Sequence, residues 1–266
     1  MKLHRVICLS AIVFTELSLQ VYAQSSIEPA NYNNPPPEVS PDGTAVVALF
    51  EDQAPWGSNQ NENILTSRGV PFQTFPSTRM GDLDLTQFRK VVLVSQQPDD
   101  FYMRLQDFRG RFESYALGGG ILEMHLANYF GGAVERVMLP FGIRASPGFC
   151  SNTVSIAGPT DPLVTTPNGI TSSELQNWNC SAHGSLMGVV ELGLNIVINS
   201  LEGPLGPATA EGVPACGAGP MVVTYSPVEW FNPDTRRFNE NLLCFGLGGV
   251  GTCPVPPFRW TGTKVP

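Results

Sequence analysis

The sequence has little charge, and little of it is basic. Only 14% of its 266 residues are charged, and 23 acidic residues outnumber 15 basic ones for a net charge of −8. A negative chain repels phosphate backbones and anionic lipids, so nucleic acid is not expected as a partner. Beyond residue 23, no segment approaches the roughly 18 consecutive apolar residues of a membrane-spanning helix, so no membrane span is expected after that point.

Metal-binding and nucleophile motifs are also scarce. The chain has no Cys-x-x-Cys, its cysteines are not interleaved with its three histidines, and it has no Gly-x-Ser-x-Gly. Zinc sites and nucleophile elbows of the hydrolase type rely on such patterns. We therefore expect no metal and no cofactor.

The first 23 residues have the pattern of a signal peptide. Lys2 and Arg5 give a basic start, a mostly apolar stretch follows, and Val21-Tyr22-Ala23 resembles a cleavage site. This predicts a secreted or periplasmic protein. Residues 24–43 contain "PPPEVSPDG" and are expected to form a Pro-rich tether. A single domain is then expected over residues 44–246, followed by a Gly/Pro-rich C-terminal coil over residues 247–266.

Five cysteines follow the expected signal peptide. In an oxidising compartment the simplest expectation is two disulfides and one remaining thiol. Proximity in the sequence favours Cys150 with Cys180 and Cys244 with Cys253, which leaves Cys216 over. Other pairings remain open at this point, because spacing alone does not determine connectivity.

Apolar runs of strand length alternate with helical patterns in the first half of the chain. Thr44–Phe50, Phe88–Gln96 and Ile121–Ala127 read as strands buried on both faces. Between the last two, apolar residues recur every three or four positions and predict one long helix beginning near Pro98. This order predicts an α/β fold, a flavodoxin-like open, mostly parallel sheet with helices on both faces.

Five stretches stand out in this order: "TAVVALFEDQ", "KVVLVSQQPDDF", "ALGGGILEMHLANYFGG", "GPTDPLVTTPNGI" and "GPMVVTYSPVEWFNPDTRRFNENLLCF". Together they resemble the class I glutamine amidotransferase-like family, in particular its secreted and trehalose-utilisation-type relatives. They span about residues 44–246. The resemblance implies a flavodoxin-like core, with a cysteine nucleophile at the sharp turn after the glycine-rich strand and a histidine and an acid later in the chain.

The chain departs from that family at the nucleophile. Between Gly118 and Gly132 there is no cysteine and no serine, and the turn carries Met124 and His125 instead. A thioether has no ionisable proton and does not attack a carbonyl carbon. Asp161-Pro162 stands where the relatives have a His-Pro pair. These departures argue against amidotransferase or cysteine-peptidase activity.

The candidate site residues follow the predicted strands. Glu123 and His125, two apart on a strand, are expected on one face, and Glu51 and Asp52 follow the first strand. Carboxyl ends of parallel strands form the crevice where open α/β sheets bind ligands, so these four are the predicted ligand-binding residues. Glu123, His125 and His183 are the catalytic candidates. The alternative is that they are structural, shaping the turn and a cysteine loop.

The sequence thus favours a non-catalytic domain that binds a small ligand or a protein partner at this crevice. One alternative is a hydrolase that acts on a carbohydrate through acid–base residues, and another is a structural envelope protein. An enzyme should bring His125 and His183 within reach of a carboxylate in one open pocket. A binding module should show an open pocket with aromatics, and a structural protein a plugged crevice.

Overall fold

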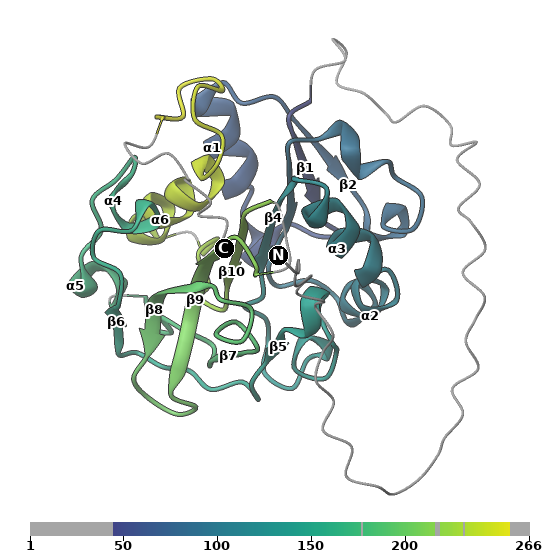
Figure 1. Cartoon of the computed structure of the whole chain (residues 1–266). Coiled ribbons are helices and arrows are strands. Elements are labelled where there is room, and N and C mark those ends of the chain that lie inside the picture. Colours follow the sequence, from purple (N-terminus) through teal and green to yellow (C-terminus); the bar gives the residue numbers. More distant parts are fainter. Residues whose placement is uncertain (1–44, 177, 216–218, 231, 256–266) are drawn as a thin grey trace, which may run out of the picture.

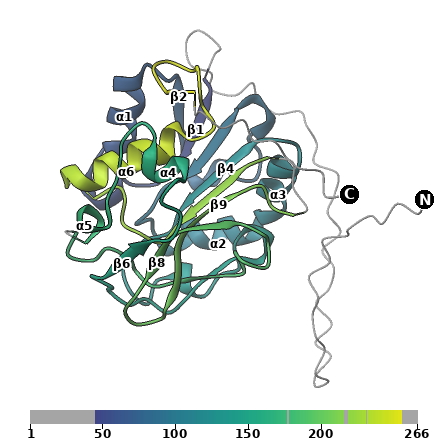
Figure 2. The ribbon, with the colours of Figure 1, turned by 60° about the vertical axis from the view of Figure 1, so that its left-hand side comes forward.

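A computed structural model describes residues 45–176, 178–215, 219–230 and 232–255 (Figure 1). The expected signal peptide and tether, Cys216 and the last residues of the C-terminal coil lie outside these ranges. One eight-stranded sheet runs through the molecule and carries helices on both faces (Figures 1 and 2). The expected α/β fold with a mostly parallel sheet is confirmed. No helix in the described ranges combines the length and apolar character needed to cross a membrane.

Five parallel strands form the half of the sheet that carries the site. They are β1 (Val47–Phe50), β2 (Phe72–Phe75), β3 (Lys90–Leu93), β4 (Ile121–His125) and β10 (Met221–Thr224). Their spatial order is β2-β1-β3-β4-β10, which is the flavodoxin-like order. Every residue of β1, β3, β4 and β10 is buried, which is why these strands read as continuous apolar runs.

An antiparallel extension completes the sheet beyond β10. It consists of β9 (Gly206–Gly212), β8 (Asn195–Ser200) and β6 (Val154–Ile156), and a separate pair joins β5 (Arg144–Ala145) to β7 (Leu186–Met187). Strand β9, "GPATAEG", carries no apolar run and was not expected from the sequence. It forms because β8 and β10 pair with it on both sides and satisfy its backbone groups.

Two pairs of helices cover the two faces of the sheet (Figure 2). α1 (Gln60–Arg68) and α6 (Pro233–Cys244) pack on one face, and α2 (Asp99–Asp107) and α3 (Arg109–Leu117) on the other. The single helix expected after Pro98 is therefore two helices, because Phe108 leaves the helical region at φ −103° and ψ 12°. Two short helices, α4 (Pro162–Thr165) and α5 (Ser172–Leu175), lie beside α6. Single 3₁₀ turns occur at Pro55–Gly57, Ser77–Arg79, Leu85–Gln87, Ala133–Glu135 and Pro140–Gly142.

The two expected cysteine pairs are both found at disulfide distance. The Cα atoms of Cys150 and Cys180 are 5.1 Å apart, and those of Cys244 and Cys253 are 5.3 Å apart. The second pair ties the last turn of α6 to the segment that follows it. This fixes the helix end whose carbonyl groups contribute to the site described below.

A pair of glycine substitutions tests the packing at the amino end of the sheet. A Cβ atom on Gly219 would lie 2.2 Å from the Gly120 carbonyl oxygen and 2.8 Å from that of Ala116. Both contacts are to backbone, so Gly219→Ala should lower the free energy of unfolding by about 1–3 kcal/mol. Gly110→Ala in α3 meets nothing within 4 Å and should raise it by about 0.5–1 kcal/mol. Denaturant unfolding measures both, and equal effects would contradict the packing.

Candidate functional site

Four ionisable side chains form a continuous buried charge chain, Lys90–Glu123–His125–Glu229, beneath the carboxyl ends of β3 and β4. All four are fully buried. Lys90 Nζ lies 2.6 Å from Glu123 Oε2, and His125 Nε2 lies 2.7 Å from Glu123 Oε1. His125 Nδ1 lies 2.8 Å from Glu229 Oε1. The two-residue spacing of Glu123 and His125 thus brings their side chains together as expected.

The charge chain ties together elements that are far apart in sequence. At one end, Lys90 Nζ donates to the carbonyl oxygens of Leu242 (2.6 Å), Leu243 (3.1 Å) and Phe245 (3.1 Å) at the end of α6. The helix dipole favours a cation at this position. At the other end, Glu229 accepts from the Asn61 side chain in α1 at 2.7 Å.

Glu229 also accepts from the backbone N–H of Ser95, two residues beyond the end of β3, at 2.9 Å. The charge chain therefore fixes the relative positions of β3, β4, α1, α6 and the loop after β10.

Both ring nitrogens of His125 are held by carboxylates. Burial alone would lower the pKa of the imidazole, but Glu229 and Glu123 outweigh it and raise the pKa to about 9. Burial likewise would raise the pKa of Glu123, but Lys90 and His125 lower it. At neutral pH His125 is an imidazolium with both N–H groups engaged. It has no lone pair with which to accept a proton from a substrate.

Glu51 and Asp52 are also engaged within the protein. Oε2 of Glu51 and Oε2 of Glu62 are buried and receive no donor from the rest of the described chain. Burial first, and then the neighbouring Glu62 carboxylate, raise the pKa of Glu51 to about 8, so Glu51 keeps its proton and shares it with Glu62. The Asp52 carboxylate accepts from both the backbone N–H and the hydroxyl of Ser77 at 2.6 Å.

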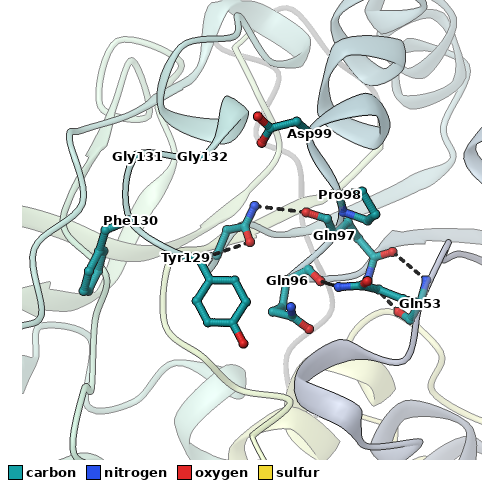
Figure 3. A pocket seen from close by; sticks show the side chains of 10 residues that line it. Gln53, Gln96, Gln97, Pro98, Asp99, Tyr129, Phe130, Gly131 and Gly132 are labelled. Carbon is teal, nitrogen blue, oxygen red and sulfur yellow. Dashed lines mark hydrogen bonds between the residues drawn. The ribbon is translucent and has the colours of Figure 1, made fainter.

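An open pocket of about 410 Å³ lies at the carboxyl ends of β1, β3 and β4 (Figure 3). None of the four predicted ligand-binding residues lines it. The lining consists of side-chain amides, one acid, two aromatic rings and small residues, namely Gln53, Gln96, Gln97, Pro98, Asp99, Asn128, Tyr129, Phe130, Gly131 and Gly132. In Figure 3, Asp99 lies at the start of α2 and Phe130 points away from the other lining side chains.

Gln97 joins the loop after β1 to the end of β3. Its Oε1 accepts from the backbone N–H groups of Asp52 (2.7 Å) and Gln53 (3.1 Å). Its Nε2 donates to the carbonyl oxygens of Gln53 (2.8 Å) and Ser95 (2.9 Å). All the hydrogen-bonding capacity of this amide is used to hold the pocket wall.

Gln96 and Trp56 form a second, unusual contact in the same wall. Both have left-handed backbones, with φ 53° and 55°, and the Trp56 backbone N–H donates to Gln96 Oε1 at 2.8 Å. The Trp56 indole donates to the Ser95 hydroxyl at 3.0 Å and packs against the ring of Tyr129. Sequence reasoning missed both glutamines, although the run Ser95-Gln96-Gln97 is a polar stretch at the end of an apolar strand.

His183 lies behind this wall and has a different set of partners. Its ring packs against those of Trp56, Phe130 and Tyr225, and Nδ1 lies 2.8 Å from the Asn128 carbonyl oxygen. A carbonyl oxygen only accepts, so Nδ1 carries the proton. Burial lowers the pKa of His183 to about 4, so the ring is neutral. His125 and His183 therefore do not converge on one carboxylate.

The serines nearest the two histidines and the pocket wall are buried. Ser95 is 0% exposed and accepts from Trp56, and Ser181 and Ser185 are also buried.

Asp99 and Asp100 fall in the first turn of α2, where acids are favoured by the helix dipole. Asp99 also accepts from the backbone N–H of Ala133 at 2.7 Å. No group of three or more potential metal ligands occurs within the described residues.

Several solved structures are similar to this chain. A putative GMP synthase subunit from Thermoplasma acidophilum matches with a TM-score of 0.45 and 14% identity, over 74% of this chain and 91% of that one. A glutamine amidotransferase from Thermotoga maritima matches with a TM-score of 0.43 and 11% identity, over 73% and 80%. A GH42 β-galactosidase, Gan42B, matches with a TM-score of 0.38 and 14% identity, over 75% of this chain and 29% of that one.

No protein-family model matches the chain, and no curated protein matches it.

The shared proton of Glu51 predicts a pH dependence of stability. The pKa is higher in the folded protein (about 8) than in the unfolded chain (about 4.5), so protonation favours the folded state. This stabilisation is complete below about pH 4.5 and is lost as the pH rises through about 8. Glu51→Gln keeps a donor to Glu62 and should become more stable than the wild type as the pH rises through this window.

Denaturant unfolding between about pH 4.5 and 8.5 measures the difference between the two proteins. The exposed Glu191→Gln serves as the matched control and should follow the wild type. A constant difference between Glu51→Gln and the wild type at all pH values would contradict a shared proton.

Removing the cation from the charge chain tests its structural weight. Lys90→Met leaves Glu123 buried with one partner fewer and three helix-end carbonyl groups without their donor. Breaking a buried ion pair from one side costs about 3–5 kcal/mol of unfolding free energy. Thermal melting should show this loss, while the exposed pair Arg79–Asp82 provides the control: Arg79→Met should cost less than about 1 kcal/mol. If Lys90→Met and Arg79→Met lost equal amounts of unfolding free energy, the charge chain would not stabilise the fold.

Proposed function

We propose that this chain is a secreted or periplasmic, non-catalytic amidotransferase-like domain that binds a small ligand in the pocket at the carboxyl edge of its sheet. The observation that carries the proposal is the state of His125. At the end of β4, where the family that the sequence resembles is expected to have its nucleophile, this chain has an imidazolium whose two nitrogens are both held by buried carboxylates.

The pocket itself supports binding over a structural role. Its volume of about 410 Å³ lies within the range of small-molecule sites, and it is open rather than filled by side chains. Aromatic rings beside several amides can fix the orientation of a polar ligand. The four residues first predicted to bind the ligand act in this proposal as the frame. Glu123 and His125 are fully buried, Glu51 is paired with Glu62, and the Asp52 N–H donates to Gln97 in the pocket wall.

The hydrolase alternative needs an acid and a base that reach the substrate. Glu123 and His125 are 0% exposed, and His183 is 6% exposed and covered by aromatic rings. Asp99, which does line the pocket, is paired with Arg136 at 3.2 Å. This geometry favours the binding module over the hydrolase. Secretion is supported by the signal-like residues 1–23 and by the two cysteine pairs at disulfide distance.

A ligand screen by thermal shift tests the proposal. The full chain without its first 23 residues is melted with neutral sugars, amino acids, carboxamides, organic acids and divalent metal ions. A ligand of the folded state raises the melting temperature by mass action, by an amount that grows with concentration. Tyr129→Ala removes a ring that is 67% exposed in the pocket and should abolish this shift without lowering the melting temperature of the free protein.

Phe149→Ala is the matched control. This aromatic ring is 43% exposed, does not line the pocket, and should leave the shift unchanged. A panel without any shift, or a shift that Tyr129→Ala retains, would count against binding at this pocket. Turnover of a sugar substrate by the wild type that is lost in a His183→Ala variant would favour the hydrolase.

A further inference from the structure

We infer that Gln96 determines the specificity of the pocket, and that the ligand is an uncharged molecule that presents an oxygen acceptor to the side-chain amide of Gln96. This inference rests on the proposed binding function. It adds the residue that selects the ligand and the chemistry that this residue accepts.

The orientation of the Gln96 amide is fixed by its neighbours. The Trp56 backbone N–H, 2.8 Å away, requires an acceptor, so the oxygen of the amide faces Trp56 and the nitrogen faces the other way. The backbone is held as well: the Gln96 N–H donates to the Ala127 carbonyl at 2.7 Å, and its carbonyl accepts from Gln53 Nε2 at 2.6 Å. Every polar group of Gln96 except Nε2 therefore has a partner.

Nε2 of Gln96 is the unsatisfied donor. No group in the described part of the chain accepts a hydrogen bond from it, although Gln96 is only 8% exposed and lines the pocket. Nε2 is not among the fully buried side-chain atoms that lack a partner, so it faces the solvent of the pocket. A ligand oxygen can accept from Nε2 there, whereas a ligand that brings another donor cannot. Figure 3 shows the Gln96 amide beside the pocket, with the Tyr129 ring drawn next to it.

The backbone of Gln96 indicates that the side chain is needed there. At φ 53° a residue with a Cβ atom is strained by about 1–2 kcal/mol, and glycine would relieve the strain. Such strain persists only where the surroundings impose it, and it occurs preferentially at binding sites. Trp56, whose φ is 55°, is strained in the same way, and it is the residue that orients Gln96. Two strained residues in contact thus hold one amide donor toward the pocket.

The surrounding charges favour an uncharged acceptor. Asp99, the acid in the pocket lining, pairs with Arg136, and the whole chain carries a net charge of −8, so the pocket offers no charge that attracts an anion. A ligand cation finds no free carboxylate in Asp99, which already accepts from Ala133 and pairs with Arg136. The acceptor is therefore a carbonyl or hydroxyl oxygen, as found in a carboxamide or a polyol. The exposed Tyr129 ring offers an apolar face for the rest of the molecule.

Acetamide and acetate test whether the ligand has to be uncharged, because the two molecules have nearly the same shape and differ in charge. Glucose tests a hydroxyl oxygen as the acceptor. In protein labelled with ¹⁵N, the Gln96 side-chain resonance is the one that disappears in Gln96→Glu. Acetamide or glucose should shift this resonance with a saturating concentration dependence, and acetate should not. The more effective of the two distinguishes a carbonyl from a hydroxyl ligand. An acetate response equal to both, or no response to either neutral probe, would overturn the inference.

Gln96→Glu tests the donor. The glutamate still accepts from the Trp56 N–H but has no N–H to offer, so the affinity for any ligand found by thermal shift should fall about tenfold or more. Gln106→Glu is the matched control, because Gln106 Oε1 likewise accepts a backbone N–H, that of Met138 at 2.8 Å, outside the pocket. Its affinity should equal that of the wild type.

Gln96→Gly provides a second variant, whose folding is favoured by the left-handed backbone. The relief of about 1–2 kcal/mol of backbone strain offsets the loss of the acceptor for the Trp56 N–H, so this variant should melt close to the wild type. It should also bind the ligand about tenfold more weakly. If a ligand binds in a Tyr129-dependent way and both Gln96 variants retain its affinity, the specificity inference fails while the binding function stands. If no ligand binds, the binding function fails.

Discussion

The buried ion pair between Lys90 and Glu123 is the constraint on which the rest of the site depends. Two charges without water are stable only when every remaining hydrogen-bonding position is filled. Here the end of α6 satisfies the ammonium, and His125 satisfies the second oxygen of the carboxylate. His125 in turn requires Glu229, which requires Asn61 and the Ser95 N–H. One buried cation therefore determines the relative positions of two strands, two helices and a loop.

The pocket inherits its shape from this buried frame. Glu229 fixes the backbone of Ser95, and the next two residues, Gln96 and Gln97, form the pocket wall. Gln97 uses its whole amide to hold the loop after β1, while Gln96 leaves one nitrogen free. Two neighbouring residues of the same type thus have different tasks, and the difference arises from backbone conformation rather than from side-chain chemistry.

Most of the parallel core could be predicted from the sequence, because strands buried on both faces are near-continuous apolar runs, interrupted here only where the charge chain lies. The same reasoning could not find β9, whose "PATAE" centre is held by its neighbours rather than by its own composition. The break between α2 and α3 was also missed, because the apolar periodicity runs through Phe108 without interruption. A local sequence pattern predicts which residues of a segment are buried. It predicts less well the conformation that neighbouring segments impose on it.

The site shows the same limit. Glu123 and His125 could be found from their spacing on a strand, but their partners are remote: Glu229 lies 104 residues from His125. Without those partners the sequence could not distinguish an exposed acid–base pair from a buried frame. Gln96 and Gln97 escaped notice because amides belong to no familiar chemical motif, and the features that mark Gln96 out are a dihedral angle and a free donor.

The closure of the charge chain also bears on how such a sequence can change over time. Because each member takes one of its partners from its neighbour in the charge chain, a single replacement leaves a buried charge with a partner missing, and a second replacement must follow to restore balance. We expect descendants of this fold to retain all four ionisable residues or to exchange them jointly for apolar ones of matching volume. Substitutions at these four positions should therefore be correlated among related sequences.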